Sequence, residues 1–244
     1  MNSSQEMPNL PVGELVARPD PARPPERKLF EGRFISLEPL SADRHADALY
    51  DCSHGSPEKE RIWTYLFNGP FESSAVMREL LEKQEVLKEP LFFAVIDNGR
   101  KSPVGMVSYL NCVPAMRSIE LGNIWYSPAV QRSKTNTEAM FLMLCHAFDE
   151  LGYRRVEWKC NALNEPSRRA ARRLGFEFEG LFRQHMIIKQ RNRDTAWYAM
   201  MDRDWPQIKR NMTRWLYPTE ARYEALSLRE LSARTRKGCG WIGR

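Results

Sequence analysis

Hydrophobic and polar positions along this chain follow two periods, and they predict an order of strands and helices. Apolar residues at every second position predict strands, whereas apolar residues three or four positions apart predict helices. The predicted strands cover residues 33–38, 91–96, 104–110, 119–126, 155–160, 176–188 and 195–202. The predicted helices cover residues 41–52, 73–88, 137–151, 165–174 and 204–217. Strands mixed with helices in this order predict an α/β or α+β sandwich, with a mixed central sheet flanked by helices.

Turn and cap residues mark several ends of these elements. Asp97-Asn98-Gly99 predicts a hairpin turn between two apolar strands. Pro128 stops the strand at residues 119–126, and Gly152 and Gly175 follow the ends of two predicted helices. Val156, Trp158 and Cys160 alternate with polar residues, so we expect them on one face of their strand.

The two ends of the chain differ in composition from its middle. Prolines and few large apolar side chains make up residues 1–28, which predicts a disordered leader. Residues 29–205 are predicted to form one domain, and residues 206–244 a helical and basic extension. No apolar run is long enough to span a bilayer, and no secretory signal is recognisable. Together with five scattered cysteines that lack metal-site spacing, this predicts a cytoplasmic protein without a metal or a membrane partner.

Positive charge is in excess, with a formal net charge of +6 and a pI near 9.1. Such an excess suits a nucleic acid as well as a site for an anionic cofactor, so charge alone does not choose between them. Part of it lies on one predicted helix, where positions 168 and 172 share a face, as do positions 169 and 173. Arg168, Arg169, Arg172 and Arg173 either attract phosphates or an acidic partner, or form a solvated helix face.

A polar turn at residues 131–136 leads from a predicted strand directly into an apolar helix. Backbone N–H groups at a helix N-terminus lack partners and, with the helix dipole, favour a pyrophosphate. Arg132 and Lys134 add positive charge at this point. The alternative is an ordinary strand–helix loop with solvated cations.

This region resembles a known family. Strand, Pro128, Gln131-x-x-x-x-Asn136 and then Thr137-Glu138-Ala139 on an apolar helix resemble the acetyl-CoA motif of the GNAT superfamily. The match continues through residues 151–156, 164–167 and 174–180 and through Arg193-Asp194-x-x-Trp197-Tyr198. This succession resembles the ribosomal-protein N-acetyltransferase (RimJ/RimL-like) branch over about residues 30–205. The resemblance implies a GNAT α/β fold with acetyl-CoA as a transiently bound cosubstrate.

The same resemblance implies roles for particular residues. The strand before the motif would splay from the next one, so that its backbone around residues 124–126 pairs with pantetheine. Asn164 would hydrogen-bond the cofactor and Ser167 would lie near its sulfur, although both residue types also cap helices. The implied cofactor contacts are Ile124, Tyr126, Gln131, Arg132, Ser133, Lys134, Thr135, Asn136, Thr137 and Asn164.

Three positions depart from the family pattern. Lys134 and Asn136 stand where the motif has small residues, and a lysine keeps the backbone farther from phosphate than a glycine does. The ammonium of Lys134 would compensate for this longer distance from the backbone if it contacts the phosphate directly. Ala171 stands where many members carry a tyrosine that protonates the leaving thiolate, so Ser167 is the remaining hydroxyl for that step.

Acetyl transfer to an amine also needs a base that takes a proton from the amine. Glu120 lies on the strand leading to the cofactor site, where the resembling family often places a carboxylate. His185 lies on a late strand that faces the expected cleft, and its unperturbed pKa suits the task. For both residues, the alternative is a solvated or structural polar group.

The sequence therefore predicts an N-acetyltransferase that moves an acetyl group from acetyl-CoA to a primary amine by direct attack in a ternary complex. The acceptor is a protein N-terminus, a lysine or a small-molecule amine, and the branch resemblance favours the protein N-terminus. Two alternatives remain: a catalytically weakened CoA-binding module of the same fold, and, less favoured, a basic nucleic-acid-binding protein. The sequence leaves a homodimer open.

Overall fold

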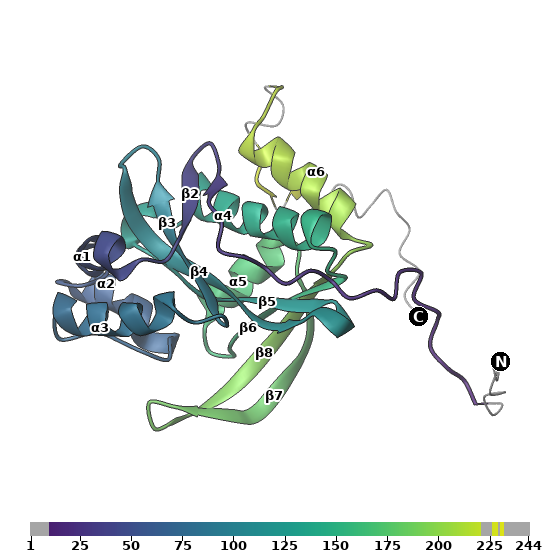
Figure 1. The fold of residues 1–244 in the computed structure, drawn as a ribbon, viewed down its shortest axis with the longest axis horizontal. Coiled ribbons are helices and arrows are strands. Elements are labelled where there is room, and N and C mark those ends of the chain that lie inside the picture. Colours follow the sequence, from purple (N-terminus) through teal and green to yellow (C-terminus); the bar gives the residue numbers. More distant parts are fainter. Residues whose placement is uncertain (1–9, 221–225, 229, 232–244) are drawn as a thin grey trace.

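The computed structural model describes residues 10–220, 226–228 and 230–231 of the chain (Figure 1). Its centre is an eight-stranded sheet with the order β1-β2-β3-β4-β5-β6-β8-β7. The strands are β1 (Phe30–Glu31), β2 (Ile35–Pro39), β3 (Leu91–Asp97), β4 (Ser102–Val113), β5 (Ser118–Tyr126), β6 (Arg155–Asn161), β7 (Glu177–Ile188) and β8 (Arg191–Met201). Only β5 and β6 pair in parallel, and all other neighbours in this sheet are antiparallel.

Helices cover both faces of this sheet. They are α1 (Ala42–Ser53), α2 (Pro57–Glu60), α3 (Ser74–Glu85), α4 (Lys134–Cys145), α5 (Glu165–Leu174) and α6 (Trp205–Leu216), with short turns η1 (Arg61–Tyr65), η2 (Pro114–Met116), η3 (Pro128–Val130) and η4 (His146–Glu150). In Figure 1, α4 and α6 lie together on one side of the sheet and α1 to α3 on the other. The predicted α/β fold with a mixed sheet is confirmed.

Two hydrophobic clusters hold these layers together. The larger one joins one sheet face to α4, α5 and α6, and it contains Val156, Trp158 and Cys160, which share a face as predicted. The smaller cluster joins the opposite face to α1 and α3 and contains Trp63 and Trp125. Alternation along each strand therefore divides the side chains between two cores, because successive residues point to opposite faces.

Helix α4 begins three residues earlier than the apolar pattern predicts. Ser133 is its N-cap, and the Ser133 hydroxyl accepts a hydrogen bond from the backbone N–H of Thr135 at 3.2 Å. Lys134 to Asn136 therefore form the first helical turn instead of a loop. A cap satisfies an orphan N–H group at low cost, so a serine ahead of polar residues extends the helix beyond its apolar part.

Glu138 fastens α4 to the first strands. Its side chain is 0% exposed and accepts hydrogen bonds from the backbone N–H groups of Arg33, Phe34 and Ile35 at 3.0, 2.6 and 2.9 Å. Gly32 permits this close approach, because a Cβ there would lie 2.5 Å from the Glu138 Oε2 atom. The motif residue Glu138 thus organises the fold in this structure.

Both ends of the described chain differ from their predicted boundaries. Residues 18–28 contact the domain: Ala22 is 7% exposed, and the backbone N–H groups of Ala22 and Arg23 donate to Pro114 and Leu151. At the other end, α6 packs on α4 and contributes to the larger core, so the domain continues past residue 205. Residues 1–9 and most of the basic tail lie outside the described residues. None of the described helices has the length and apolar character needed to cross a bilayer.

Candidate functional site

Strands β5 and β6 separate in the middle of the sheet. Their pairing runs from Ser118 opposite Arg155 to Leu121 opposite Trp158 and stops there. Beyond that point β5 continues beside β4, and β6 continues beside β8. Asn123 has a φ of 51°, and the register between β4 and β5 shifts at the same place. The wedge between the strands leaves the β6-facing edge of residues 122–126 without a sheet partner among the described strands, as the resemblance implies.

The N-terminus of α4 follows directly after this wedge. From the end of β5 the chain passes through η3 to Gln131, whose side-chain amide donates to the Tyr126 carbonyl at 3.0 Å. Arg132 adopts a left-handed conformation with φ of 61°, and Ser133 then caps the helix. An exposed arginine and the positive end of a helix dipole thus lie together.

The structure places Lys134 on the α6 side of this helix end. Its ammonium donates to the Leu216 carbonyl at 3.0 Å and lies over the rings of Phe34 and Trp215, 5.4 and 5.9 Å from their centroids. A cation is favourable there because Leu216 is the last residue of α6. Two residues on, the buried Asn136 Oδ1 accepts no hydrogen bond from the described residues.

Arg173 reaches the same helix end from α5. Its guanidinium donates to the Thr137 hydroxyl at 2.9 Å, and burial lowers its pKa. Arg168, by contrast, contacts the Tyr198 hydroxyl, the Ala162 carbonyl and Glu165. The sequence marks these arginines only as a group, and the packing of α5 against the sheet selects Arg173 as the one beside the α4 N-terminus.

Asn164 and Ser167 lie at the N-terminus of α5. The Asn164 side chain accepts from the Ser167 backbone N–H at 3.1 Å, so the capping function expected as an alternative is present. The Ser167 hydroxyl accepts from the Trp158 indole N–H at 3.0 Å. Burial raises the pKa of the neighbouring Cys160 thiol, while a hydrogen bond with Ser167 acts in the opposite direction.

Glu120 lies on β5 just before the strands separate. Its side chain is 5% exposed, and Oε2 accepts from Asn111 at 2.6 Å and from Lys159 at 2.8 Å. Lys159 pairs with Glu157 as well, at 2.8 Å. No described residue donates to the other oxygen, Oε1, which lies beside Gly122.

His185 lies on the β7–β8 hairpin, which Figure 1 shows extending beyond the other strands. Its Nδ1 atom is 3.0 Å from the Thr195 hydroxyl, and its ring lies 6.2 Å from that of Trp197. The Lys159 ammonium lies over the Trp197 ring, 3.9 Å from its centroid. Both candidate bases therefore belong to the sheet face that also carries α1 to α3, with Lys159 and Trp197 linking them.

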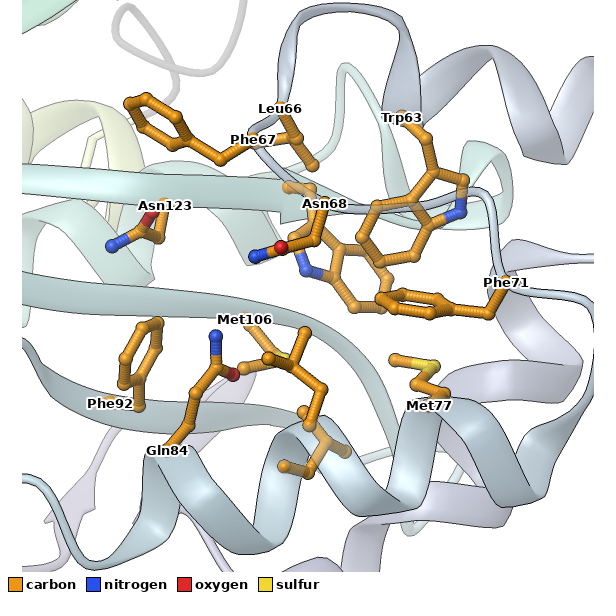
Figure 2. A pocket seen from close by; sticks show the side chains of 13 residues that line it. Trp63, Leu66, Phe67, Asn68, Phe71, Met77, Gln84, Phe92, Met106 and Asn123 are labelled. Carbon is orange, nitrogen blue, oxygen red and sulfur yellow. The ribbon is translucent and has the colours of Figure 1, made fainter. Parts of the chain in front are cut away.

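A pocket opens on this same face between α3, the loop after η1 and the sheet (Figure 2). Its walls are mostly aromatic and aliphatic, with three amides: Trp63, Leu66, Phe67, Asn68, Phe71, Met77, Leu80, Leu81, Gln84, Phe92, Met106, Asn123 and Trp125. Figure 2 shows the Gln84 amide pointing into it, and the Gln84 Oε1 atom is buried without a hydrogen-bond partner among the described residues. No motif marks these positions, so the sequence does not reveal the pocket.

Residues 63–71 form a roof loop over the pocket, and other elements hold it in place. The Lys189 ammonium, at the tip of the β7–β8 hairpin, donates to the carbonyls of Trp63, Asn68 and Gly69 at 2.8, 3.3 and 2.5 Å. The Tyr65 hydroxyl donates to the Leu163 carbonyl at 3.2 Å. Both contacts tie the roof loop to the side of the wedge formed by β6, β8 and β7. Within the described ranges, no group of His, Cys, Asp and Glu side chains is arranged to hold a metal ion.

Comparison with known proteins places this geometry in a family. Residues 35–177 match the family described as an acetyltransferase (GNAT) domain. A crystal structure of a GCN5-related N-acetyltransferase from Brucella melitensis is 43% identical, covers 88% of this chain and 98% of its own, and superposes with a TM-score of 0.83. A GNAT-family structure from Chromobacterium violaceum is 37% identical over 82% of this chain and 99% of its own, with a TM-score of 0.74. YdaF of Bacillus subtilis, named as a ribosomal N-acetyltransferase, is 27% identical over 174 residues, covering 69% of this chain and 90% of that protein.

Proposed function

Because the chain belongs to the GNAT acetyltransferase family, we propose that it transfers an acetyl group from acetyl-CoA to a primary amine in a ternary complex. The observation that carries this proposal is the wedge between β5 and β6, which opens directly onto the capped N-terminus of α4. The pantetheine and the pyrophosphate of one cofactor would need such an extended backbone edge and an anion site in succession.

In the proposed complex, pantetheine pairs with the backbone of Ile124 and Tyr126, and the pyrophosphate lies at residues 131–137. Arg132 and Arg173 supply positive charge beside the helix end, which supports an anion there. Asn164 adds a polar group at the start of α5. If an N–H group of the cofactor donates to the Tyr126 carbonyl, that hydrogen bond replaces the one from the Gln131 side chain.

The amine nitrogen then attacks the thioester carbonyl, and a proton must leave it. We assign this proton to Glu120, directly or through a water, because its Oε1 atom is unoccupied by the described residues and lies next to the wedge. The tetrahedral intermediate collapses as the carbon–sulfur bond breaks, and the Ser167 hydroxyl donates a hydrogen bond to the departing thiolate, which then takes a proton from solvent. His185 is the second candidate base, on the same face but on the hairpin.

A protein N-terminus is the acceptor that the relatives favour, since YdaF carries the name of a ribosomal N-acetyltransferase. The named activity belongs to that protein. For this chain it makes peptide N-termini the first acceptors to assay, followed by lysine and small-molecule amines.

Thermal melts with and without millimolar acetyl-CoA test the cofactor. A ligand at a hundredfold over its dissociation constant adds roughly 2.7 kcal/mol to the free energy of unfolding. We expect a rise of several degrees in Tm, and a smaller rise with pantetheine, which lacks the pyrophosphate. Arg173→Met should reduce the rise, while Arg169→Met, on the exposed part of the same helix, should preserve it.

The alternatives give different results. No shift in Tm together with no binding in calorimetry would overturn the proposal. A shift without release of CoA over an amine panel would identify a binding module of the same fold. A basic nucleic-acid-binding protein would instead bind a duplex with an affinity that falls steeply with salt.

A further inference from the structure

Two carboxylates share one ammonium on the sheet face that carries the candidate base. Glu120 on β5 and Glu157 on β6 are opposite each other in the parallel pairing of these strands. The Lys159 ammonium lies 2.8 Å from the Oε2 atom of each carboxylate. All three side chains are largely buried, so salt and water screen their charges less than they would at the surface.

Lys159 is itself held in one place. Its backbone pairs with that of Trp197 on β8, and its ammonium lies over the Trp197 ring, 3.9 Å from the centroid. A cation so close to the face of an indole ring is attracted to it. Since the ring and the second carboxylate hold the ammonium as well, Lys159 fixes the Glu120 carboxylate instead of following its rotation.

These contacts determine how the Glu120 carboxylate is turned. Its Oε2 atom accepts from Lys159 on β6 at 2.8 Å and from Asn111 on β4 at 2.6 Å, so the donors come from the strands on both sides of β5. The other oxygen, Oε1, then lies beside Gly122, where the wedge begins. Without Lys159, one neutral amide would be left to hold this orientation.

Glu157 prevents the ammonium from acting on Glu120 alone. Burial acts to raise the pKa of Glu157, but hydrogen bonds with Lys159 and Arg155 outweigh it, so that its pKa is lowered. Arg155 is shared in turn with Glu179, at 2.5 Å. Glu157 is therefore negative at neutral pH, and its charge opposes the ionisation of Glu120 that the ammonium favours.

Other charged groups act on Glu120 from farther away. Arg193 on β8 is near enough for its charge and that of Glu120 to attract each other. His185 adjoins the group through the ring of Trp197. Among the described residues, Lys159 is the one cation at ion-pair distance from Glu120. Its removal should therefore change the surroundings of this carboxylate more than any other single loss of positive charge.

We propose that Lys159 is a positioning residue for the reaction: it keeps the Glu120 carboxylate ionised and turned with Oε1 towards the wedge, and Glu157 limits the strength of this effect. This inference rests on the proposed acetyltransferase function, with Glu120 as the base. Lys159 acts through Glu120 and takes no proton itself.

Titration of the Glu120 carboxyl group measures the effect of both neighbours without any acceptor. In protein labelled with ¹³C at the glutamate carboxyl carbon, the NMR signal that is missing in Glu120→Gln belongs to Glu120. We expect its titration midpoint to rise by roughly one pH unit or more in Lys159→Met, because the ammonium is lost while Glu157 stays negative. In Glu157→Gln the midpoint should fall, because the ammonium then acts on Glu120 alone. Lys159→Arg keeps the charge and should keep the midpoint.

The pH dependence of kcat tests whether this effect matters for the reaction. With acetyl-CoA and the best acceptor of the amine panel both saturating, the acid limb of kcat reports groups in the enzyme–substrate complex. It should move to higher pH in Lys159→Met and to lower pH in Glu157→Gln. A purely structural role of Lys159 would lower kcat without moving the limb. Lys101→Met and Glu31→Gln remove the same charges at exposed positions and are the controls, with no movement expected.

The outcomes separate this inference from the proposed function. An unchanged Glu120 midpoint in Lys159→Met and Glu157→Gln would overturn the inference, and Glu157→Gln decides alone where Lys159→Met does not fold. A shifted midpoint with an unmoved acid limb would also overturn it, because Lys159 would then have no part in the reaction. Failure to release CoA with every amine of the panel would instead overturn the proposed function, and the role of Lys159 with it.

Discussion

The two carboxylate oxygens of Glu120 have different surroundings. Oε2 belongs to an ion pair with Lys159 and a hydrogen bond with Asn111, whereas Oε1 remains open beside the wedge. His185 is more exposed and is held through the Thr195 hydroxyl. Their positions in the sequence make both Glu120 and His185 candidates for the base, and only their surroundings in the structure distinguish them.

Replacing the proposed base tests this distinction. Glu120→Gln should lower kcat by about 10²- to 10⁴-fold, the usual contribution of a general base, and leave the Kd for acetyl-CoA nearly unchanged. His185→Gln is the matched control and should keep most of the activity. Ser167→Ala should lower kcat as well, without weakening CoA binding. Near-native kcat in both Glu120→Gln and Ser167→Ala would show that these residues do not act in the chemical step, and a larger loss in His185→Gln would assign the base to the histidine.

Lys134 gives a second prediction at the scale of the residue. Lys134→Glu should raise the Kd for CoA at least several-fold, because it places a negative charge at the proposed pyrophosphate site of α4. Lys134→Gly should keep CoA affinity, since it restores the family pattern, but should lower Tm because the hydrogen bond to Leu216 is lost. Calorimetry and melts measure the two effects separately. An unchanged Kd in Lys134→Glu would place the pyrophosphate elsewhere.

At the scale of the element, the roof loop depends on contacts from distant parts of the chain. Three of its backbone carbonyls accept from the single ammonium of Lys189. A loop with few regular hydrogen bonds of its own opens more easily than the strands around it. The hairpin that carries Lys189 thus shapes the pocket without lining it.

Lys189→Met should therefore loosen the roof loop. We expect KM for the acceptor to rise and the Kd for acetyl-CoA to stay the same, because the proposed cofactor site lies in the wedge and at the α4 N-terminus, whereas the ammonium of Lys189 contacts the roof loop. Lys83→Met, at an exposed position of α3, is the control and should change neither. Steady-state kinetics with the acceptor varied at saturating acetyl-CoA measure this. A parallel weakening of cofactor binding would contradict the separation of the two sites.

At the scale of the whole molecule, three histidines are buried, two of them in α1 and at its C-terminal cap and one at the start of η4. His45, His54 and His146 are 3%, 4% and 3% exposed. Burial lowers the pKa of all three, and for His146 to about 4, with Lys28 and Arg23 acting in the same direction and Glu150 against it. The unfolded chain, with histidine pKa values near 6.5, binds more protons than the folded one between about pH 6.5 and 4.

Stability should consequently be complete above pH 6.5 and fall as the pH drops through this window, by up to about 1.4 kcal/mol per pH unit for each such histidine. Urea unfolding at pH 7.5, 5.5 and 4.5 measures the slope. His146→Gln should flatten it, whereas the exposed His185→Gln should not. An identical slope in His146→Gln would show that this histidine titrates normally in the folded protein.

Local patterns determined most of the fold. Alternating residues give the strands, and apolar stripes with Gly152 and Gly175 after them give the helices, because these features depend only on neighbours in sequence. The strand–turn–helix at residues 119–137 led to the correct family for the same reason. The polar cap of α4 shows the limit: Ser133 starts the helix before its apolar pattern begins.

The sequence by itself determined the order of the longer elements, the family and the polar segment at which α4 begins. Only the tertiary structure decided which polar groups meet: it turned Lys134 towards α6, selected Arg173 for the α4 N-terminus and buried Arg193 under Phe67. It also placed residues 18–28 on the domain and assembled the pocket from α3, β3, β4, β5 and the roof loop. The physical reason is that backbone propensity acts over a few residues, whereas burial and polar contacts can join residues that are far apart in the sequence. The ammonium of Lys189 and the Trp63 carbonyl that accepts its hydrogen bond are 126 positions apart.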